Sequence, residues 1–522
     1  MFGPALTLVL ALVSSAVVAA PAVNNVHKNA VASLNPLSTS LPFHFPASVY
    51  ENTPYSGAAS SSLSKEDEVK TATDYISKKL NLGANDFKVF NSFTDAAGVT
   101  HVYGAHMVNG ARISNHQASA HVKNGEVTSF SSSFGTAQHF AKSDLAVSAP
   151  KATVNFEKAS ATASAQLGIL FTLNSNAFLS MSSSQMARSC MPTSSSCATT
   201  PRPSGSRVFN GINPEIKGSS PNGWTAGKAT EGNNIITSNL SGKTTPSTRN
   251  GVFDTKFNGG NEPGTDDNIA ASAVNLFYIN NLMHDITYQY GFTEKAGNFQ
   301  KDNFGKGGRG NDAVSINVQS SRGVNNANFL SPADGQPGVM NIGCLRTAEA
   351  GGMGEGWSDA LALIVLAKSS DTATTGINVG TYVRGRPSGI RSHPYTTNMK
   401  VNPLTYGDLQ TRDEVHDVGE VWTSLLWEVY WSLVTKHGFS SNLSNAKQSA
   451  GNVVAMQNII GGMMIQPCNP TFLSARDAIV AADASYYNGA NKCEILKAFA
   501  KRGLGSKATS SRRNDFSVPS GC

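Results

Sequence analysis

A glycine-rich segment that leads into an uninterrupted apolar run constrains this 522-residue chain more than any other sequence feature. Residues 349–359 read EAGGMGEGWSD, and Ala360 to Leu366 follow without a charged residue. Glycines that give way to a helix-length apolar run predict a tight loop feeding a buried helix. Glu355 and Asp359 are four positions apart, so they share one face of that helix.

Two carboxylates at the start of an apolar helix are unfavourable to bury unless a cation meets them. A metal ion bound by Glu355, with a histidine oriented by Asp359, would satisfy both groups. The alternative is a pair of carboxylates that the helix dipole stabilises near the N-terminus. The spacing alone leaves both interpretations open.

The sequence of residues 349–359 closely resembles a segment of the fungalysin family that carries the third zinc ligand. This family comprises secreted fungal zinc metalloendopeptidases related to thermolysin. The resemblance covers most of the chain from about Ser219 to Cys522 and part of the region before it. It implies one zinc ion as cofactor, Glu355 as the third zinc ligand, and Asp359 as a support for a ligand histidine. It also implies an α+β, thermolysin-like fold of two lobes, preceded by a small α+β propeptide domain.

The histidine pair that such a zinc site needs is missing from the sequence. A catalytic zinc takes three protein ligands and one open position for water, and His-Glu-x-x-His on a helix supplies two ligands and a general base. None of the eleven histidines precedes a glutamate, and no two are four positions apart. The family's zinc-binding helix belongs just upstream of the glycine-rich segment, where this chain runs directly from Met340 to Gly343. We therefore expect the chain, as it stands, not to hydrolyse peptides.

Two later segments resemble the rest of the family's site. Residues 389–392 (GIRS) resemble the segment whose arginine hydrogen-bonds a substrate carbonyl, which implies that role for Arg391. Residues 413–422 (DEVHDVGEVW) resemble the motif whose histidine stabilises the tetrahedral oxyanion, which implies that catalytic role for His416. The alternatives are a surface salt bridge for Arg391 and helix capping for His416.

Residues 325–329 (NNANF) resemble the family's edge strand, which binds an extended peptide by adding it to the sheet. The resemblance implies substrate-binding roles for Asn326, Ala327 and Phe329. Without it, the segment is only an asparagine-rich strand end. The expected partners are a protein or peptide substrate and the chain's own propeptide as inhibitor.

The charge distribution and the first twenty residues indicate where the protein acts and which classes of partner it does not bind. The net charge of +6 is spread without a Lys/Arg block, so neither nucleic-acid nor membrane binding is indicated. Leu6 to Ala20 is a short apolar run that ends in small residues, so we interpret residues 1–20 as a signal peptide. No later segment is long and apolar enough to serve as a membrane anchor. We expect a secreted, extracellular monomer.

Cysteines and glycosylation sequons agree with secretion. Six cysteines suit an oxidising compartment. The last four could form two disulfides in three possible pairings, and they are Cys344, Cys468, Cys493 and Cys522. Asn239 and Asn442 begin Asn-Leu-Ser sequons, which are acceptors for N-glycosylation.

Residues 21–206 are expected to form the propeptide. Within them, 65–135 should be a helix followed by an antiparallel meander, because apolar residues recur with helical spacing from Lys65 and two Asn-Gly pairs then mark hairpin turns. This part resembles the propeptide domain of fungalysins and thermolysin-like enzymes, which implies folding assistance and inhibition until cleavage. We interpret its four histidines as solvated strand residues without an acidic partner, and they are His101, His106, His116 and His121.

Residues 171–206 depart from the family. They are rich in Ser, Met, Thr and Cys, and a structureless insert of this length inside a compact domain is unusual. A mis-spliced or out-of-frame reading is therefore a hypothesis for this part of the sequence.

Residues 207–400 are expected to form a mixed, β-rich N-terminal lobe and residues 401–522 a helical C-terminal lobe. The first contains a predicted helix at 268–290, in which we interpret His284 as structural. The helices predicted for the second lie at 418–436, 452–464, 473–484 and 493–502.

Two hypotheses for function follow. In the first, the gene encodes an active zymogen and this translation has lost an exon, as the anomalies at 171–206 and at Met340–Gly343 suggest. In the second, the protein is a non-catalytic secreted relative that binds peptides or prosegments without cutting them.

Overall fold

The structure, a computed structural model, describes most of the chain in several stretches. The described residues are 48–53, 63–134 except 109, 171–174, 178–181, 215–318 with short gaps (226, 240, 249–251, 256, 258–260 and 262–263), 334–335, 347–381 and 387–522. Several sequence predictions fall outside them: the signal peptide at 1–20, most of 171–206, the Met340–Gly343 junction, Cys344, and the strand residues Asn326, Ala327 and Phe329.

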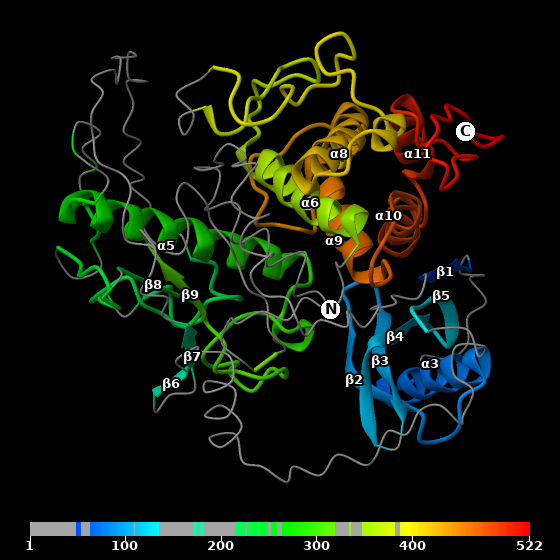
Figure 1. Cartoon of the computed structure of the whole chain (residues 1–522), viewed down its shortest axis with the longest axis horizontal. Coiled ribbons are helices and arrows are strands. Elements are labelled where there is room, and N and C mark those ends of the chain that lie inside the picture. The colour runs from blue at the N-terminus through cyan, green and yellow to red at the C-terminus, as the bar shows by residue number, and fades with distance from the viewer. Residues whose placement is uncertain are drawn as a thin grey trace, which may run out of the picture.

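Residues 48–53 and 63–134 form what we call the N-terminal sheet unit, one helix on a five-stranded antiparallel sheet (Figure 1). The strand order is β1-β5-β4-β3-β2. Its elements are β1 (Val49–Asn52), α3 (Lys65–Leu80), β2 (Phe87–Thr94), β3 (Val99–Val108), β4 (Ala111–Lys123) and β5 (Glu126–Ser132). Ser64 caps α3 by accepting a hydrogen bond from the Asp67 amide. The β4–β5 turn places Asn124 and Gly125 at positive φ, as an Asn-Gly hairpin requires.

The two faces of this sheet pack against different parts of the chain. One face covers α3, where Ile76 and Val102 are fully buried. The other face packs on α9 (Gly451–Ile465) and α10 (Phe472–Tyr487), which lie next to the sheet in Figure 1. There the Tyr103 hydroxyl donates to the carbonyl of Met464 at 2.9 Å.

The interpretation of the four histidines as solvated strand residues is wrong. His101, His116 and His121 are only 1–2% exposed. The β3–β4 register sets His101 opposite His121, on the sheet face that α9 and α10 cover. An acidic partner is also present, because the Asp95 carboxylate lies 3.0 Å from His101 Nε2. Alternation along a strand gives the face of a residue but not what covers that face.

The middle of the chain centres on the long helix α5 (Asp266–Gln289). β8 (Ile235–Ser238) packs beside α5 and pairs in parallel with β9 (Val314–Asn317). These are the strands of the expected N-terminal lobe within the described residues of 215–400. Farther upstream, β6 (Phe171–Asn174) and β7 (Phe178–Met181) form an antiparallel pair.

The second half of the described chain is helical. Its helices are α6 (Ala348–Leu366), α8 (Val415–His437), α9, α10 and α11 (Lys492–Lys501), and they share one apolar core. Each of α8 to α11 covers the range that hydrophobic periodicity predicts, with small shifts at the ends. The architecture is α+β, as predicted.

The glycine-rich segment is helical, so the prediction of a tight loop there is wrong. Thr347 caps α6, and the segment forms its first turns. The glycines are needed where α6 crosses α8: a Cβ on Gly352 would lie 2.3 Å from Val418 Cγ1, and one on Gly356 would lie 2.7 Å from the carbonyl oxygen of Gly419. Gly419 of α8 is equally crowded, since its Cβ would lie 2.8 Å from Glu355 Cβ. The two backbones therefore approach too closely for larger side chains.

One of the possible cysteine pairings is present, because Cys493 is bonded to Cys522. Cys468 is also disulfide-bonded. Within the described stretches, no helix combines the length and the apolar character needed to cross a membrane.

Candidate active site

Glu355 and His416 meet where α6 crosses the start of α8. Glu355 Oε2 lies 3.7 Å from His416 Nε2, and its side chain is 17% exposed. Oε2 is buried without a hydrogen-bond partner among the described residues. Burial raises the pKa of Glu355, although the His416 imidazole and the Arg391 guanidinium oppose that rise. A buried carboxylate oxygen left without a donor is suited to bind a cation.

His416 is held by Glu414, the residue that caps α8. The Glu414 carboxylate accepts from the backbone amides of His416 (2.8 Å) and Asp417 (3.1 Å). Its other oxygen lies 2.7 Å from His416 Nδ1, which then carries the proton. This geometry leaves Nε2 directed at Glu355, and the side chain of His416 is 48% exposed. The capping role that was an alternative for His416 therefore belongs to Glu414.

Asp359, one turn after Glu355, binds Arg391. Arg391 donates from Nε to Oδ2 at 2.7 Å and from Nη2 to Oδ1 at 3.0 Å. The Tyr395 hydroxyl adds a third bond to Oδ2 at 2.6 Å. Both oxygens of Asp359 are thus occupied by an arginine and a tyrosine, whereas the family resemblance implies a histidine partner. The ion pair is buried, with the Arg391 side chain 7% exposed, so it differs from the surface pair considered as an alternative.

Burial alone would lower the pKa of Arg391, but the adjacent Asp359 carboxylate outweighs it and raises that pKa above its usual value. The guanidinium therefore stays charged beside Glu355. Because Asp359 takes Nε and Nη2, Nη1 lies outside this ion pair.

Glu420 is a part of the site that the sequence reasoning missed. It lies on α8 with 4% exposure and accepts hydrogen bonds from the backbone amide (2.8 Å) and the hydroxyl of Ser392. The segment that carries Arg391 is thereby tied to α8. Burial raises the pKa of Glu420, against hydrogen bonds from Ser392. A glutamate on the apolar face of an amphipathic helix is the signal that could have identified it.

The described residues do not fit a zinc ion. Zinc needs three protein ligands, and no group of three or more His, Cys, Asp or Glu side chains suited to a metal occurs in the described part of the chain. Among the described residues of this site, Glu355 offers one buried carboxylate oxygen without a hydrogen-bond partner, which is a single possible ligand. The substrate-binding strand predicted at Asn326, Ala327 and Phe329 lies outside the described residues and cannot be placed beside this site.

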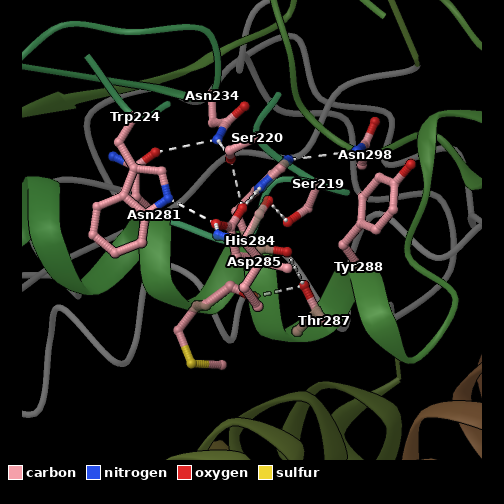
Figure 2. A network of polar contacts seen from close by, with 12 residues as sticks. Ser219, Ser220, Trp224, Asn234, Asn281, His284, Asp285, Thr287, Tyr288 and Asn298 are labelled. Carbon is pink, nitrogen blue, oxygen red and sulfur yellow. Dashed lines mark hydrogen bonds and ion pairs between the residues drawn. The ribbon is translucent and has the colours of Figure 1, made fainter. Parts of the chain in front are cut away.

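His284 belongs to a separate buried network, shown in Figure 2, as its structural interpretation predicts. The centre of the network is Asp285 on α5, which accepts hydrogen bonds from the Ile216 amide (2.8 Å), the Ser220 hydroxyl (2.6 Å) and Trp224 Nε1 (2.8 Å). His284 Nδ1 lies 3.0 Å from the same carboxylate. The network fastens residues 216–224 to α5.

Replacing Asp285 with asparagine should destabilise the chain by about 1–2 kcal/mol, because an amide cannot accept from all four donors. The pKa of Asp285 is lowered because hydrogen bonds from His284, Ser220 and Ile216 outweigh burial, which alone would raise it. Its stabilisation should therefore be present above about pH 4 and be lost as pH falls further. Urea unfolding of wild type and Asp285→Asn across pH 3–7 measures both effects. Asp267→Asn, on the exposed first turn of α5, is the matched control and should change stability by less than about 1 kcal/mol.

Comparison with known proteins gives matches to two family models. The model of the fungalysin metallopeptidase (M36) family matches residues 198–343 and 338–508. The fungalysin/thermolysin propeptide motif matches residues 85–134, within the N-terminal sheet unit.

Individual relatives are extracellular proteinases of fungi. The chain is 43% identical over 291 residues to extracellular metalloproteinase 2 of Arthroderma gypseum, covering 47% of this chain and 46% of that protein. It is 42% identical over 350 residues to extracellular metalloproteinase MEP of Pyricularia oryzae, covering 56% and 55%. The chain spans about half the length of the curated relatives it matches.

Proposed function

Because this chain belongs to the fungalysin metallopeptidase family, we propose that it is the precursor of a secreted, extracellular zinc metalloendopeptidase, and that its present sequence cannot hydrolyse peptides. The observation that carries the proposal is the pairing of Glu355 with His416 at the α6–α8 crossing. One carboxylate and one imidazole of the family's site face each other there. The His-Glu-x-x-His motif, which would supply the two histidines and the general base, does not occur in the sequence.

The family match itself supports a missing segment. It falls into two parts that meet at residues 338–343. This is the place where the sequence passes from Met340 to Gly343 and where the resemblance puts the zinc-binding helix. A deletion at this point would remove two zinc ligands and the base while leaving Glu355, Arg391 and His416 in place.

In this proposal Glu355, Arg391 and His416 keep the roles that the family implies, whereas Asp359 binds Arg391 in place of a ligand histidine. Glu355 is the remaining metal ligand, and Asp359 acts by positioning Arg391. Arg391 has Nη1 outside its ion pair with Asp359, so this nitrogen can donate to a substrate carbonyl. His416 presents Nε2 on the same side as Glu355, where it can stabilise an oxyanion. Asn326, Ala327 and Phe329 would bind an extended peptide.

In the same proposal the chain is exported and carries its own inhibitory propeptide. Residues 1–20 would be the signal peptide, 21–206 the propeptide, and 207–400 and 401–522 the two lobes. The match of the propeptide motif to 85–134 supports an intramolecular partner that inhibits until it is cleaved. The names of the fungal relatives support an extracellular product.

A second candidate function is peptide binding without cleavage. It is favoured by the hydrogen bonds on the groups proposed to contact substrate, since Asp359 binds Arg391 and Glu414 binds His416 although the zinc ligands are missing. A protein of this kind would bind extended peptides or prosegments in the same place.

Two measurements test these proposals. The purified chain should contain no stoichiometric zinc by elemental analysis and should show no chelator-sensitive hydrolysis of casein. One equivalent of zinc together with such hydrolysis would contradict the proposed inactivity. Sequencing the transcript across Met340–Gly343 then separates the two candidates: extra codons for His-Glu-x-x-His would assign an active protease to the gene, and their absence would favour peptide binding.

A further inference from the structure

The N-terminal sheet unit contains two histidine pairs, each formed across the β3–β4 ladder. In the inner pair, Nδ1 of His101 lies 2.8 Å from Nδ1 of His121. In the outer pair, Nδ1 of His106 lies 3.3 Å from Nδ1 of His116, with the rings stacked. Four of the eleven histidines of the chain are thus placed two by two in one small domain.

Two facing Nδ1 atoms can share only one hydrogen. One ring nitrogen must donate and the other must accept, so the accepting nitrogen is unprotonated. In the inner pair, His101 Nε2 lies 3.0 Å from the Asp95 carboxylate and donates to it. His121 Nε2 lies 3.4 Å from the Ser119 hydroxyl. If both rings of a pair were doubly protonated, two N–H groups would point at each other.

The surroundings of both pairs disfavour a second proton on the histidine rings, because they lower the pKa of three of them. Burial, together with the neighbouring His101, holds the pKa of His121 well below its usual value. Burial and His106 lower the pKa of His116 to about 4, and burial lowers the pKa of His106. Among the described residues, the other titratable groups facing the pairs are Asp95, Tyr103 and Tyr486 at the inner pair and Asp86 at the outer pair.

The inner pair is also part of the contact with the helical half of the chain. The Asp95 oxygen that accepts from His101 accepts a second hydrogen bond, at 2.8 Å, from the Tyr486 hydroxyl of α10. Tyr103 lies parallel to the His101 ring and donates to the Met464 carbonyl at the end of α9. Lys123 donates to the Ser485 carbonyl. Rearrangement of the histidines would therefore disturb the residues that fasten the unit to α9 and α10.

We propose that the N-terminal sheet unit is an acid-sensitive clamp, in which protonation of His121 and His116 opens the sheet and releases Asp95 and Tyr103 from helices α9 and α10. This inference goes beyond the proposed function, because it concerns the contact between two parts of the chain and is independent of peptide hydrolysis.

The expected pH dependence follows from proton linkage. A histidine in the opened unit has a pKa of about 6.5, whereas the closed unit keeps His121 neutral, so the opened form takes up a proton below about pH 6.5. Stability is thus present above that pH and is lost as pH falls. From pH 7 to pH 5, one such histidine should raise the opening equilibrium about 25-fold. Together, His121 and His116 should raise it several-hundred-fold, the product of about 25 for His121 and about 20 for His116.

Hydrogen–deuterium exchange of the full chain between pH 5 and pH 7, corrected for intrinsic exchange rates, measures this opening. Peptides from β3 and β4 should lose protection several-hundred-fold between pH 7 and pH 5, whereas peptides from α8 should keep theirs. His121→Asn should reduce the pH dependence in β3 and β4 about 25-fold, because the asparagine amide can donate to or accept from His101 Nδ1 but does not titrate. His437→Asn, at the end of α8, is the matched control and should leave the pH dependence of β3 and β4 unchanged.

If His121→Asn loses protection already at pH 7, His116→Asn replaces it, since the outer pair is less enclosed. That variant should reduce the pH dependence about 20-fold. The proposal is overturned if peptides from β3 and α8 respond to pH alike, or if a folded variant at position 121 or 116 opens as wild type does.

Discussion

Replacing Asp359 with alanine is expected to destabilise the folded chain by about 3–5 kcal/mol, the largest effect of any substitution considered. The Arg391 guanidinium is buried and donates two hydrogen bonds to this carboxylate. Without its partner, a charge remains in a place from which water is largely excluded. The Tyr395 hydroxyl, which is also buried, loses its acceptor.

Urea unfolding followed by tryptophan fluorescence measures this loss. Asp417→Ala is the matched control, because it removes an aspartate from the more exposed ion pair with Arg412, whose two side chains are 21% and 47% exposed. That control should lose no more than about 1 kcal/mol. Equal losses in the two variants would show that the Asp359–Arg391 pair is no more important than a surface pair.

Gly352→Ala is expected to destabilise the chain by about 2–3 kcal/mol, although alanine is favoured over glycine in a helix by about 1 kcal/mol. The new methyl group would lie 2.3 Å from Val418 Cγ1 and 2.4 Å from Val418 Cβ, so the two helices must move apart. The same movement should separate Glu355 from His416. The unfolding midpoint in urea reports the first effect.

Gly351→Ala is the control, one position away in the same helix. Among the described residues, its methyl group would meet only Val415 Cγ1, at 3.5 Å, which is an ordinary contact. This variant should gain up to about 1 kcal/mol from helix propensity alone. If both substitutions stabilise the chain, the close crossing of α6 and α8 is not what requires glycine at position 352.

The contrast between these neighbouring glycines explains one limit of the sequence analysis. Periodicity places α8, α9, α10 and α11 well because each helix turns one apolar face to a core. The same reasoning assigns glycines to a loop, since they are poor helix formers. Only the position of α8, more than fifty residues later, shows that Gly352 and Gly356 lie at a crossing. Pairwise contacts of this kind leave no local signal.

The contacts within the candidate active site were also hidden in the sequence, because its residues lie far apart along the chain. Resemblance singled out Glu355, Asp359, Arg391 and His416, and the structure brings these four together. It did not reveal that Asp359 binds Arg391, because two residues 32 positions apart carry no sign of their contact in one sequence. Glu420 was overlooked for a related reason, since its partner Ser392 is 28 positions away.

In the proposed maturation, the packing of the N-terminal sheet unit on α9 and α10 determines which apolar surface the cleaved product would expose. Phe93 and Tyr103 lie in the same core as Met463 and Met464, each 5% exposed or less. Cleavage between the N-terminal sheet unit and the helical half, followed by dissociation of the unit, would expose an apolar patch on α9 and α10. The N-terminal sheet unit would thus shield an apolar surface of the helical half, and the shortened product should self-associate more readily than its precursor.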